Sequence, residues 1–552
     1  MISNNDAQQS GARESGQRPN AIYAPVPLHT PASTPYPAPR RHLLRTMLIS
    51  ALLIMLVASA VAAGALAYSA GNQVSVRIGN QQSALIDLRQ SFPISPYLLG
   101  ANVFPATSTL ATDQVSSGFM SYGSHVTNGL RSAHVKLLRF PGGDWGELHA
   151  YSFDQLNAFS NLLGQVNADG MIQVPLSDPS GQAGSTGSQG SLASRASNAG
   201  LTVDYMNNKQ SIQRTGKYAH APFHPVALWT VGNEPDRLLN PDTGLKYTVD
   251  DYVTAFVQFS TTMHQNDPSI KVFGPEISQF YGLGSGPTDA TGTLWMEGFL
   301  KGVSDYERQH PTLRFHLLDG VSFHRYQFDD AHQAQALLLS STSEWDYLLP
   351  PLHQLIRQDF GRDLPVALTE VNTNPGKAVP TPAFAAVWWA DTLGKLMSQQ
   401  VAYVAFFSTE GVDTPYPLLT SQGLQETPML RVMQLFAHLQ SNFVPVQVQS
   451  EPVSVYATQD DTRQTISLLF VNKSDSVQQA QISTEGTYFL PVSSWPALQI
   501  NLNAYSVVVV TLHRGAGADA YSLTPTAGTT TPALTHTVCG NQGNVLLHSL
   551  PC

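Results

Sequence analysis

Residues 227–236 have the sequence Ala-Leu-Trp-Thr-Val-Gly-Asn-Glu-Pro-Asp, and this stretch decides how the fold is interpreted. Its first five residues are apolar or β-branched and predict a short buried strand. Gly232 ends the strand, and a polar group follows at once. The same pattern of a short apolar run followed by polar or turn-forming residues recurs along the chain, so this strand is one of a series.

Seven further apolar runs of similar length accompany it, and amphipathic stretches typical of helices lie between most of them, such as Tyr252–His264. Strands that are nearly continuously apolar and alternate with helices predict a parallel sheet covered on both faces. Eight such units predict an α/β fold of the (β/α)8 TIM barrel type over residues 93–440. Asp178–Gly200 is rich in Gly, Ser and Ala, and it predicts a long loop that partly returns to helix. The seven runs are Pro96–Phe104, Val135–Pro141, Met171–Leu176, Lys271–Pro275, Gly320–Phe323, Pro365–Leu368 and Ala402–Phe407.

The pattern changes after the barrel. Residues 441–514 contain alternating strands without helical periodicity, which predicts a C-terminal antiparallel β-sandwich. The strand-like residues 73–92 precede the first barrel strand and are expected to join this sandwich. Residues 515–552 are rich in Thr, Pro and Gly and are expected to form a tail.

The N-terminal region predicts a membrane anchor. Residues 1–45 form a polar, proline-rich segment expected to be disordered and cytoplasmic. Residues 46–68 are uncharged and apolar, long enough for one transmembrane helix, and Arg40, Arg41 and Arg45 place its N-terminal side in the cytoplasm. The rest of the chain is then extracytoplasmic. An alanine-rich end leaves cleavage and secretion open as the alternative.

Composition restricts the partners and cofactors. The formal net charge is −10, and no cluster of Lys and Arg is seen in the folded region, so nucleic acid is not expected as a partner. His220 and His224 have no further His or Cys at ligand spacing, so no metal is predicted, and no nucleotide-binding motif predicts a cofactor. Cys539 and Cys552 either pair or remain free thiols.

Polar side chains follow five of the eight predicted strands, where the active sites of such barrels lie. Two of these side chains are the glutamates Glu234 and Glu370, after the fourth and seventh strands. Glycoside hydrolysis needs two carboxyl groups that flank the scissile bond, and a short separation between them leads to double displacement. The five strand ends are Arg139–Trp145, Gly232–Asp236, His324–Tyr326, Thr369–Asn372 and Phe406–Glu410.

Asn233-Glu234-Pro235, together with a second glutamate after the seventh strand, resembles clan A of the glycoside hydrolases. Arg-Phe-Pro-Gly-Gly at 139–143 resembles α-L-arabinofuranosidases and heparanase-like β-glucuronidases. The run Leu228–Asp236 is most similar to the heparanase-type family, glycoside hydrolase family 79. The resemblance covers roughly Pro96–Gln440. It implies a retaining O-glycoside hydrolase that acts on an oligo- or polysaccharide and is β-glucuronidase-like or arabinofuranosidase/xylosidase-like.

The resemblance also implies roles for individual residues. Glu234 matches the acid/base and Glu370 the nucleophile. Asn233 matches the residue that binds the sugar 2-hydroxyl, Arg139 the one that orients the nucleophile, and Tyr326 the one that hydrogen-bonds it. From their places at strand ends, we expect further substrate contacts from His324, Asp144, Trp145 and Glu410.

Some features depart from the resemblance. Phe406-Phe407 stands where many clan members have a Trp as a sugar platform, and only Lys377, Arg325 and Tyr281 are candidates to bind a sugar carboxylate. Glu276, after the fifth strand, is a rival carboxylate. The alternative function is a catalytically silent carbohydrate-binding or cell-wall-organising protein on the same scaffold, which would have no reason to keep both glutamates and Arg139.

Overall fold

The computed structural model describes most of the chain from residue 72 to residue 539. None of the helices in that part combines the length and the apolar character needed to span a bilayer. The predicted tail 1–45 and membrane helix 46–68 lie outside the described residues, except for positions 54, 55 and 59, and so does Cys552. The described residues are 54, 55, 59, 72–79, 81–106, 118–177, 190–327, 339–373, 381–410, 416–420, 424–447, 451–484, 498–514, 517–524 and 534–539.

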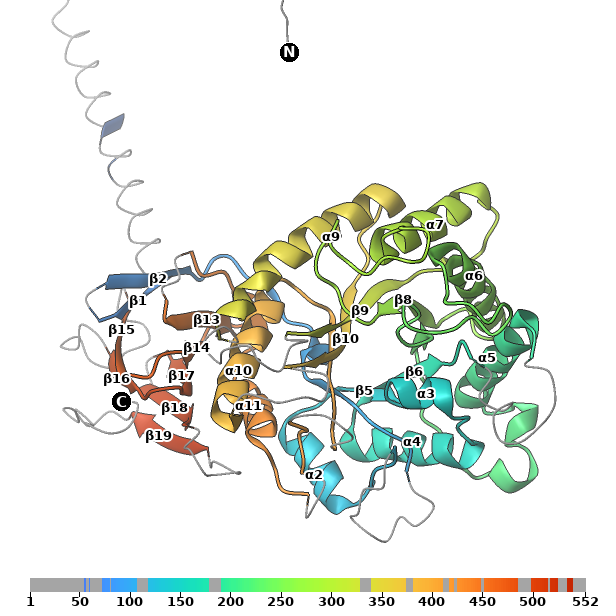
Figure 1. Cartoon of the computed structure of the whole chain (residues 1–552). Helices are drawn as coiled ribbons and strands as arrows, with labels where there is room; N and C mark the ends of the chain where they lie inside the picture. The colour runs from blue at the N-terminus through green and yellow to red at the C-terminus, as the bar shows by residue number, and fades with distance from the viewer. Residues whose placement is uncertain are drawn as a thin grey trace, which may run out of the picture. The chain divides into compact units, whose positions relative to one another are not determined.

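Eight parallel strands close into a barrel, which confirms the predicted (β/α)8 fold (Figure 1). Each strand falls within or overlaps one of the eight apolar runs, because a strand buried on both faces needs apolar residues along nearly its whole length. The strands, in chain order around the barrel, are β4 (Gly100–Asn102), β5 (Leu137–Phe140), β6 (Asp169–Val174), β7 (Leu228–Val231), β8 (Lys271–Ile277), β9 (Gly320–Tyr326), β10 (Val366–Asn372) and β11 (Tyr403–Phe406).

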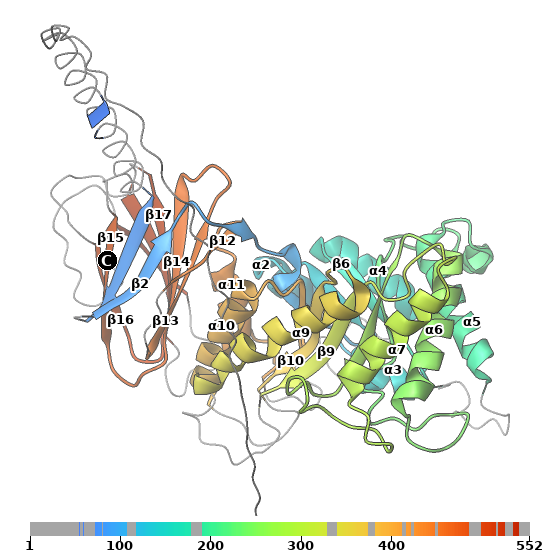
Figure 2. The ribbon, with the colours of Figure 1, turned by 90° about the horizontal axis from the view of Figure 1, so that it is seen from above.

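Helices surround the barrel on its outside (Figures 1 and 2). Local signals fix where two of them begin: Ser152 with Gln155, and Thr248 with Asp251, form reciprocal capping boxes. The described helices are α2 (Ser124–Ser132), α3 (Asp144–Leu148), α4 (Phe153–Val166), α5 (Leu192–Asn207), α6 (Val249–Asn266), α7 (Trp295–Gln309), α9 (Trp345–Phe360), α10 (Pro382–Ser398) and α11 (Pro428–Phe436).

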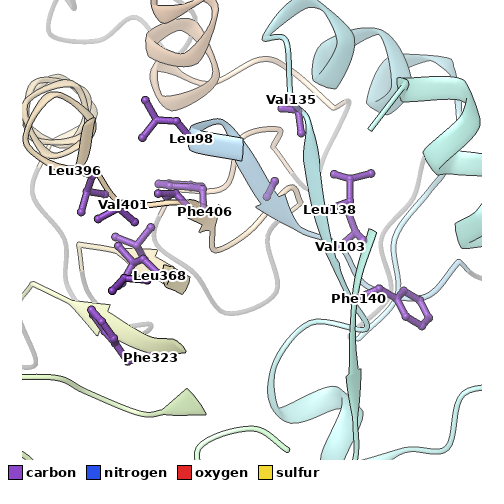
Figure 3. Packing of buried hydrophobic residues seen from close by; sticks show 14 of the residues in the cluster. Leu98, Val103, Val135, Leu138, Phe140, Phe323, Leu368, Leu396, Val401 and Phe406 are labelled. Atoms are coloured by element: carbon purple, nitrogen blue, oxygen red, sulfur yellow. The ribbon is translucent and has the colours of Figure 1, made fainter. Parts of the chain in front are cut away.

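Alternate residues of each barrel strand face opposite ways. Outward residues such as Leu138, Phe323 and Leu368 belong to the large apolar core between strands and helices (Figure 3). The inward side is layered. Its floor is apolar and includes Leu137, Met171, Phe273, Ala367 and Tyr403. Two residues further along β5, β6 and β10, the inward positions hold Arg139, Gln173 and Thr369, all buried. The strand period therefore stacks a polar layer directly on an apolar floor.

The predicted sandwich is also confirmed. One sheet has the strand order β16-β15-β1-β2 and the other β19-β18-β17-β14-β13-β12-β3. β1 pairs antiparallel with β15, so the residues before the barrel do join the sandwich, as expected. The strands are β1 (Gln73–Ile78), β2 (Gln81–Asp87), β3 (Phe92–Pro93), β12 (Asn442–Val444), β13 (Val453–Gln459), β14 (Thr465–Asn472), β15 (Gln478–Thr484), β16 (Leu498–Leu502), β17 (Val507–His513), β18 (Gly517–Leu523) and β19 (Thr535–Cys539).

The prediction that residues 515–552 form a tail is wrong for its first part. β18 pairs with β17 over seven residues, and β19 adds to β18. The sequence signal was weak because the core-facing side chains of β18 are small. Ala518 and Ala520 pack into the sandwich core, while the alternate residues Asp519 and Tyr521 are partly exposed. This alternation is typical of a strand, but here the core-facing residues have low hydrophobicity.

A buried ion pair links the barrel to the sandwich. Asp391 on α10 is fully buried, and it accepts from Lys473 Nζ at 3.1 Å and from Tyr456 Oη at 2.7 Å, both of the sandwich. Thr342, before α9, donates to the same carboxylate at 2.6 Å. Two cooperating donors and a cation satisfy this buried charge, so it fixes the two parts together.

Candidate active site

Arg139 is the centre of the polar layer. It is fully buried, and its two terminal nitrogens donate to five side chains from five strand ends around the barrel. Neutral oxygens from three residues and carboxylates from two surround the guanidinium, so it is almost completely coordinated. Nη1 donates to Asn102 Oδ1 (2.8 Å) and Glu370 Oε1 (2.8 Å), and Nη2 to Gln173 Oε1 (3.2 Å), Asn233 Oδ1 (2.9 Å) and Glu276 Oε2 (2.8 Å).

Glu370 lies near the carboxyl end of β10 with both oxygens engaged. Arg139 holds Oε1, and Tyr326 Oη donates to Oε2 at 2.7 Å. Gly143 approaches from the other side: a Cβ there would lie 2.8 Å from Glu370 Oε1, and its φ is +61°. Burial raises the pKa of Glu370, with the negative charge of Glu234 acting in the same direction, while His324 and Arg139 oppose the rise.

Glu234 follows β7 in a left-handed backbone conformation with φ of +46°, which is rare for a residue with a side chain. Such local strain is maintained where the surroundings require it, commonly at functional sites. His324 Nδ1 lies 3.0 Å from Oε1, and Arg237 Nη1 donates to Oε2 at 2.6 Å. Burial alone would raise the pKa of Glu234, but these two cations outweigh it, so in the structure described the pKa is lowered.

Glu276, the rival carboxylate in the sequence, is part of the same network. It is fully buried, and it accepts from Arg139 and, at 2.9 Å, from Thr369 Oγ1. Burial opposes its charge, but Arg139 and His324 together lower its pKa to about 2. The side chain of Glu276 is 0% exposed, with both oxygens engaged, so Glu276 is a fixed negative charge within the network.

The imidazole of His324 connects the two acids. Its Nε2 lies 3.3 Å from Glu276 Oε2, its Nδ1 lies 3.0 Å from Glu234 Oε1 and 3.5 Å from Glu370 Oε2. Burial disfavours a charged imidazole, but the carboxylates of Glu370, Glu234 and Glu276 outweigh it and raise its pKa to about 10. His324 is therefore an imidazolium at neutral pH and donates to both Glu276 and Glu234.

Glu234, His324 and Glu370 each offer an atom within 4.8 Å of the others, so a carboxylate oxygen of Glu234 lies no further than that from one of Glu370. A histidine and two carboxylates at this spacing resemble a metal site. However, Arg139 and Arg237 bring two fixed positive charges into the same space, and they disfavour a cation there. The arrangement fits two carboxyl groups that work on one bond.

Two more predicted residues join the site. Asn233 is held from both ends, because its Oδ1 accepts from Arg139 and its Nδ2 donates to Asp144 Oδ1 at 3.0 Å. Burial raises the pKa of Asp144, and the charge of Glu234 adds to this. Asp144 and Arg139 together thus fix the amide orientation of Asn233 beside Glu234.

Two other predicted residues have contacts of a structural kind. Trp145 is 7% exposed, stacks on His149, and lies so close to Gly118 that a Cβ there would be 2.6 Å away. This geometry favours a capping role over a sugar contact. Glu410 is fully buried, and its Oε2 accepts from the backbone N–H of Ser121 at 3.1 Å. That contact favours a structural role for Glu410 over the predicted substrate contact.

The structure adds residues that the sequence did not single out. Asn102 and Gln173 orient Arg139, and Arg237 contacts Glu234. Asn102 and Gln173 are lone polar residues inside apolar runs, a signal that was present in the sequence. Phe407 meets Phe104 and Tyr326 edge-on, with ring centroids 5.9 Å and 6.4 Å apart, so an aromatic ring contacts the tyrosine that binds Glu370.

Arg325 and Tyr281, candidates to bind a sugar carboxylate, are occupied with other partners. Arg325 forms a two-bond ion pair with Glu344 at 2.8 Å and 2.7 Å, and its guanidinium lies 4.8 Å from the centre of the Tyr281 ring. A guanidinium already paired in this way has little capacity for a second carboxylate. Lys377, the third candidate, lies outside the described residues.

Neither a protein-family model nor a curated protein matches this sequence. Solved structures do match it in fold. A Paenibacillus polymyxa xyloglucanase from glycoside hydrolase family 44 is 14% identical with a TM-score of 0.55, over 77% of this chain and 97% of that chain. A Thermotoga petrophila family 51 α-L-arabinofuranosidase is 17% identical with a TM-score of 0.54, over 83% and 95%. A Bifidobacterium longum family 51 α-L-arabinofuranosidase is 14% identical with a TM-score of 0.54, over 80% and 99%.

At these identities the similarity is one of fold. The chain has the barrel-and-sandwich fold of these glycoside hydrolases, and the expected likeness to arabinofuranosidases is confirmed at that level. None of the three is a heparanase-type enzyme, so that finer resemblance stays a prediction. The activity has to be argued from the site itself.

Proposed function

We propose that the protein is a retaining O-glycosidase that cleaves an oligo- or polysaccharide by double displacement. The observation that carries the proposal is the pair of buried carboxylates, Glu234 after β7 and Glu370 on β10, with one oxygen of each no more than 4.8 Å from the other. Carboxyl groups about 5 to 5.5 Å apart are typical of retaining enzymes, whereas inverting enzymes separate them by about 6.5 to 9.5 Å. The spacing leaves no room for an attacking water between them.

In the first step, an oxygen of Glu370 attacks the anomeric carbon. The bond from that carbon to the leaving oxygen breaks, the electron pair stays on the oxygen, and Glu234 gives it a proton. Arg139 and Tyr326 hold the Glu370 oxygens in one orientation and stabilise the ionised form that attacks. Asn233, fixed by Arg139 and Asp144, is placed to bind a sugar hydroxyl beside the acid.

In the second step, water attacks the anomeric carbon and passes a proton to Glu234. The bond to Glu370 breaks, and its electron pair returns to the carboxylate. His324 supports this change of role, because its imidazolium donates to Glu234 and stabilises the ionised form that acts as base. Glu276 keeps His324 charged from the other side.

The test is a panel of 4-nitrophenyl glycosides, including the α-L-arabinofuranoside, β-D-xyloside, β-D-glucoside and β-D-glucuronide. We expect release of nitrophenol from at least one, and loss of that release in Glu370→Gly. Azide should restore turnover of this variant and give the glycosyl azide of inverted configuration. Glu276→Gly is the matched control, since it removes a buried carboxylate of the same network. Rescue of Glu276→Gly in place of Glu370→Gly would reassign the nucleophile.

Tight glycan binding without turnover of any sugar would instead support the alternative, a catalytically silent carbohydrate-binding protein.

We further propose that the enzyme is anchored in a membrane through residues 46–68, with its barrel extracytoplasmic. The apolar length of that segment and the arginines before it support this proposal. Deleting residues 1–70 is expected to release a soluble, active protein. Continued sedimentation of the deleted chain with membranes would contradict the proposed anchor.

A further inference from the structure

Arg237 forms an unusual contact with the proposed acid. It follows Glu234 by three residues, and its Nη1 donates to Glu234 Oε2 at 2.6 Å. Its side chain is 63% exposed, whereas that of Glu234 is only 8% exposed. The guanidinium thus covers the outer oxygen of the acid, on the side that faces solvent.

This contact is incompatible with the role of Glu234 as a general acid, which must carry a proton. Oε1 of Glu234 faces the imidazolium of His324 at 3.0 Å, so Oε2 is the oxygen left to carry a proton to the leaving group. With Arg237 in place, Oε2 accepts a hydrogen bond from a cation and carries no proton. A carboxylate held between two cations is ionised, which suits a base and not an acid. Arg237 has to leave Oε2 before the first chemical step.

Of the two cations, only Arg237 is free to move. His324 is fully buried and is held by Glu276 on its far side. Within the described part of the chain, the side chain of Arg237 makes no hydrogen bond other than the one to Glu234. Three carboxyl groups interact electrostatically with Glu234 or Arg237, namely Glu370, Asp144 and Asp236. The cationic Arg139 is fully buried and is held by Glu370 and Glu276.

We propose that an anionic group on the leaving-group side of the substrate, a carboxylate or a sulfate, draws Arg237 away from Glu234 and thereby turns Glu234 into the acid. This inference rests on the proposed glycosidase function. A guanidinium presents five N–H donors in a planar fork that matches the oxygens of either anion. Because Glu234 protonates the leaving oxygen, its exposed neighbour Arg237 lies on the side where the leaving sugar binds.

The proton balance follows the catalytic cycle. When Arg237 moves to the substrate anion, Glu234 Oε2 takes up a proton from solvent. That proton passes to the glycosidic oxygen as the bond to the anomeric carbon breaks. Giving up that proton leaves Glu234 ionised, and the anionic product departs. Glu234 then accepts a proton from the attacking water as the bond to Glu370 breaks. That proton is released to solvent when Arg237 returns to Oε2, which restores the ionised resting state. One residue thus switches the carboxyl group between its two roles.

The experiment compares 4-carboxyphenyl and 4-carbamoylphenyl glycosides of the sugar that the nitrophenyl panel identifies, with the full-length chain. The two leaving groups have nearly the same shape and differ in charge. The pH dependence of kcat reports the ionisation of Glu234 with substrate bound. For the wild-type protein, we expect kcat to fall at higher pH with the carboxyphenyl glycoside than with the carbamoylphenyl glycoside. For Arg237→Gln, kcat should fall at the same pH with both glycosides.

The ratio of kcat/KM values for the two substrates gives a second readout. Comparing this ratio between proteins cancels the intrinsic difference between the leaving groups. We expect Arg237→Gln to reduce the preference for the carboxylate by about tenfold or more, as expected for a lost charge-assisted hydrogen bond. A 4-sulfophenyl glycoside tests in the same way whether Arg237 binds a sulfate-like anion. If Arg237 favours only one of the two anions, that anion is the group it binds on the natural substrate.

Arg357→Gln is the matched control. Arg357 is 54% exposed and pairs with Asp363 at 3.0 Å, far along the chain on α9, so its loss should leave both readouts unchanged. An equal preference in wild type and Arg237→Gln, with hydrolysis still abolished by Glu370→Gly, would overturn the inference and leave the glycosidase standing. Absence of hydrolysis with every glycoside would overturn both.

Discussion

Two buried charge networks in this molecule use similar side chains in opposite ways. Asp391, between barrel and sandwich, carries one negative charge and receives Lys473 and two hydroxyl donors. Burial would raise its pKa, but these partners lower it, Lys473 most of all. At the carboxyl edge of the barrel, Glu370 receives one bond from Arg139 and one from Tyr326, and burial raises its pKa.

The difference lies in how the positive charge is shared. Lys473 serves Asp391 and the exposed Glu451, whereas Arg139 divides its hydrogen bonds between two buried carboxylates and three neutral side chains. A buried carboxylate whose partners outweigh the cost of burial stabilises the fold, as the lowered pKa of Asp391 indicates. One for which burial outweighs its partners, as for Glu370, destabilises the fold, which is the usual conflict between stability and activity at enzyme sites.

Removing the shared cation should have the largest effect. Arg139→Gln is expected to lower kcat by about 10³-fold, because Glu370 then keeps its proton and loses its orientation. Steady-state kinetics on the best aryl glycoside measures this. Arg214→Gln is the control, since Arg214 is also buried but donates to the backbone carbonyls of Tyr205 and Pro222. If both variants lost kcat equally, Arg139 would have only a structural role.

Disrupting the network around Asp391 should lower the stability of the protein and leave its activity unchanged. Asp391→Asn leaves the buried ammonium of Lys473 without its full counter-charge, and we expect the free energy of unfolding to fall by about 3 kcal/mol. Chemical denaturation measures this, and kcat at a temperature where the variant is folded should be unchanged. The contribution of Asp391 is present above its ordinary pKa of 3.8 and is lost as the pH falls through the lowered value. A large fall in kcat would contradict the separation of the two networks.

Glu276→Gln tests the charge behind His324. Without this carboxylate the pKa of His324 should fall from about 10, so His324 loses its charge at lower pH than in the wild type. A neutral His324 no longer lowers the pKa of Glu234, so the alkaline limb of the kcat profile should move to higher pH. We expect kcat near neutral pH to drop by about 10- to 100-fold, as Glu276 does not touch the reacting atoms. An unchanged pH profile with a lower kcat would assign Glu276 a purely structural role.

The smallest effect is a gain in stability. The folded protein holds the Glu370 proton to higher pH than the unfolded chain, so stability falls as the pH rises from the ordinary value of 4.5 through the raised pKa. Glu370→Gln removes this penalty and should stabilise the fold by about 1 kcal/mol at pH 7. Thermal unfolding across the pH range measures it. A loss of stability would mean that Glu370 is as well neutralised as Asp391.

The fold was predictable because it depends on simple periodic patterns. Continuous apolar runs such as Leu228–Val231 can only be strands covered on both faces, and eight of them close a barrel. Because the active sites of such barrels lie at the carboxyl ends of the strands, Arg139, Glu234 and Glu370 could also be predicted to share one site. The end of the sandwich was missed because β18 buries alanines, which carry little signal.

The hydrogen-bond network of the site depends on local irregularities of the barrel strands, which the hydrophobic pattern of the sequence does not reveal. Register shifts occur in β8 at Pro275/Ile277 and in β10 at Leu368/Glu370. They allow consecutive residues such as Thr369 and Glu370 to contribute to the same buried network, against the strict alternation of a strand. No sequence pattern therefore indicates that Glu276 shares this network, and the contact between Arg237 and Glu234 forms next to the left-handed backbone at residue 234.

The pairing of β1 with β15 also imposes a delay on folding during synthesis of the chain. The residues from Gln73 to Ile78 emerge from the ribosome early, but their partner Gln478–Thr484 is made about 400 residues later. At ordinary translation rates of about 5 to 20 residues per second, that interval is on the order of 20 to 80 seconds. During this interval the barrel can fold, while the edge of β1 that does not pair with β2 lacks its partner and is open to wrong pairing. Newly made chains should therefore depend on chaperones until the last strands are synthesised.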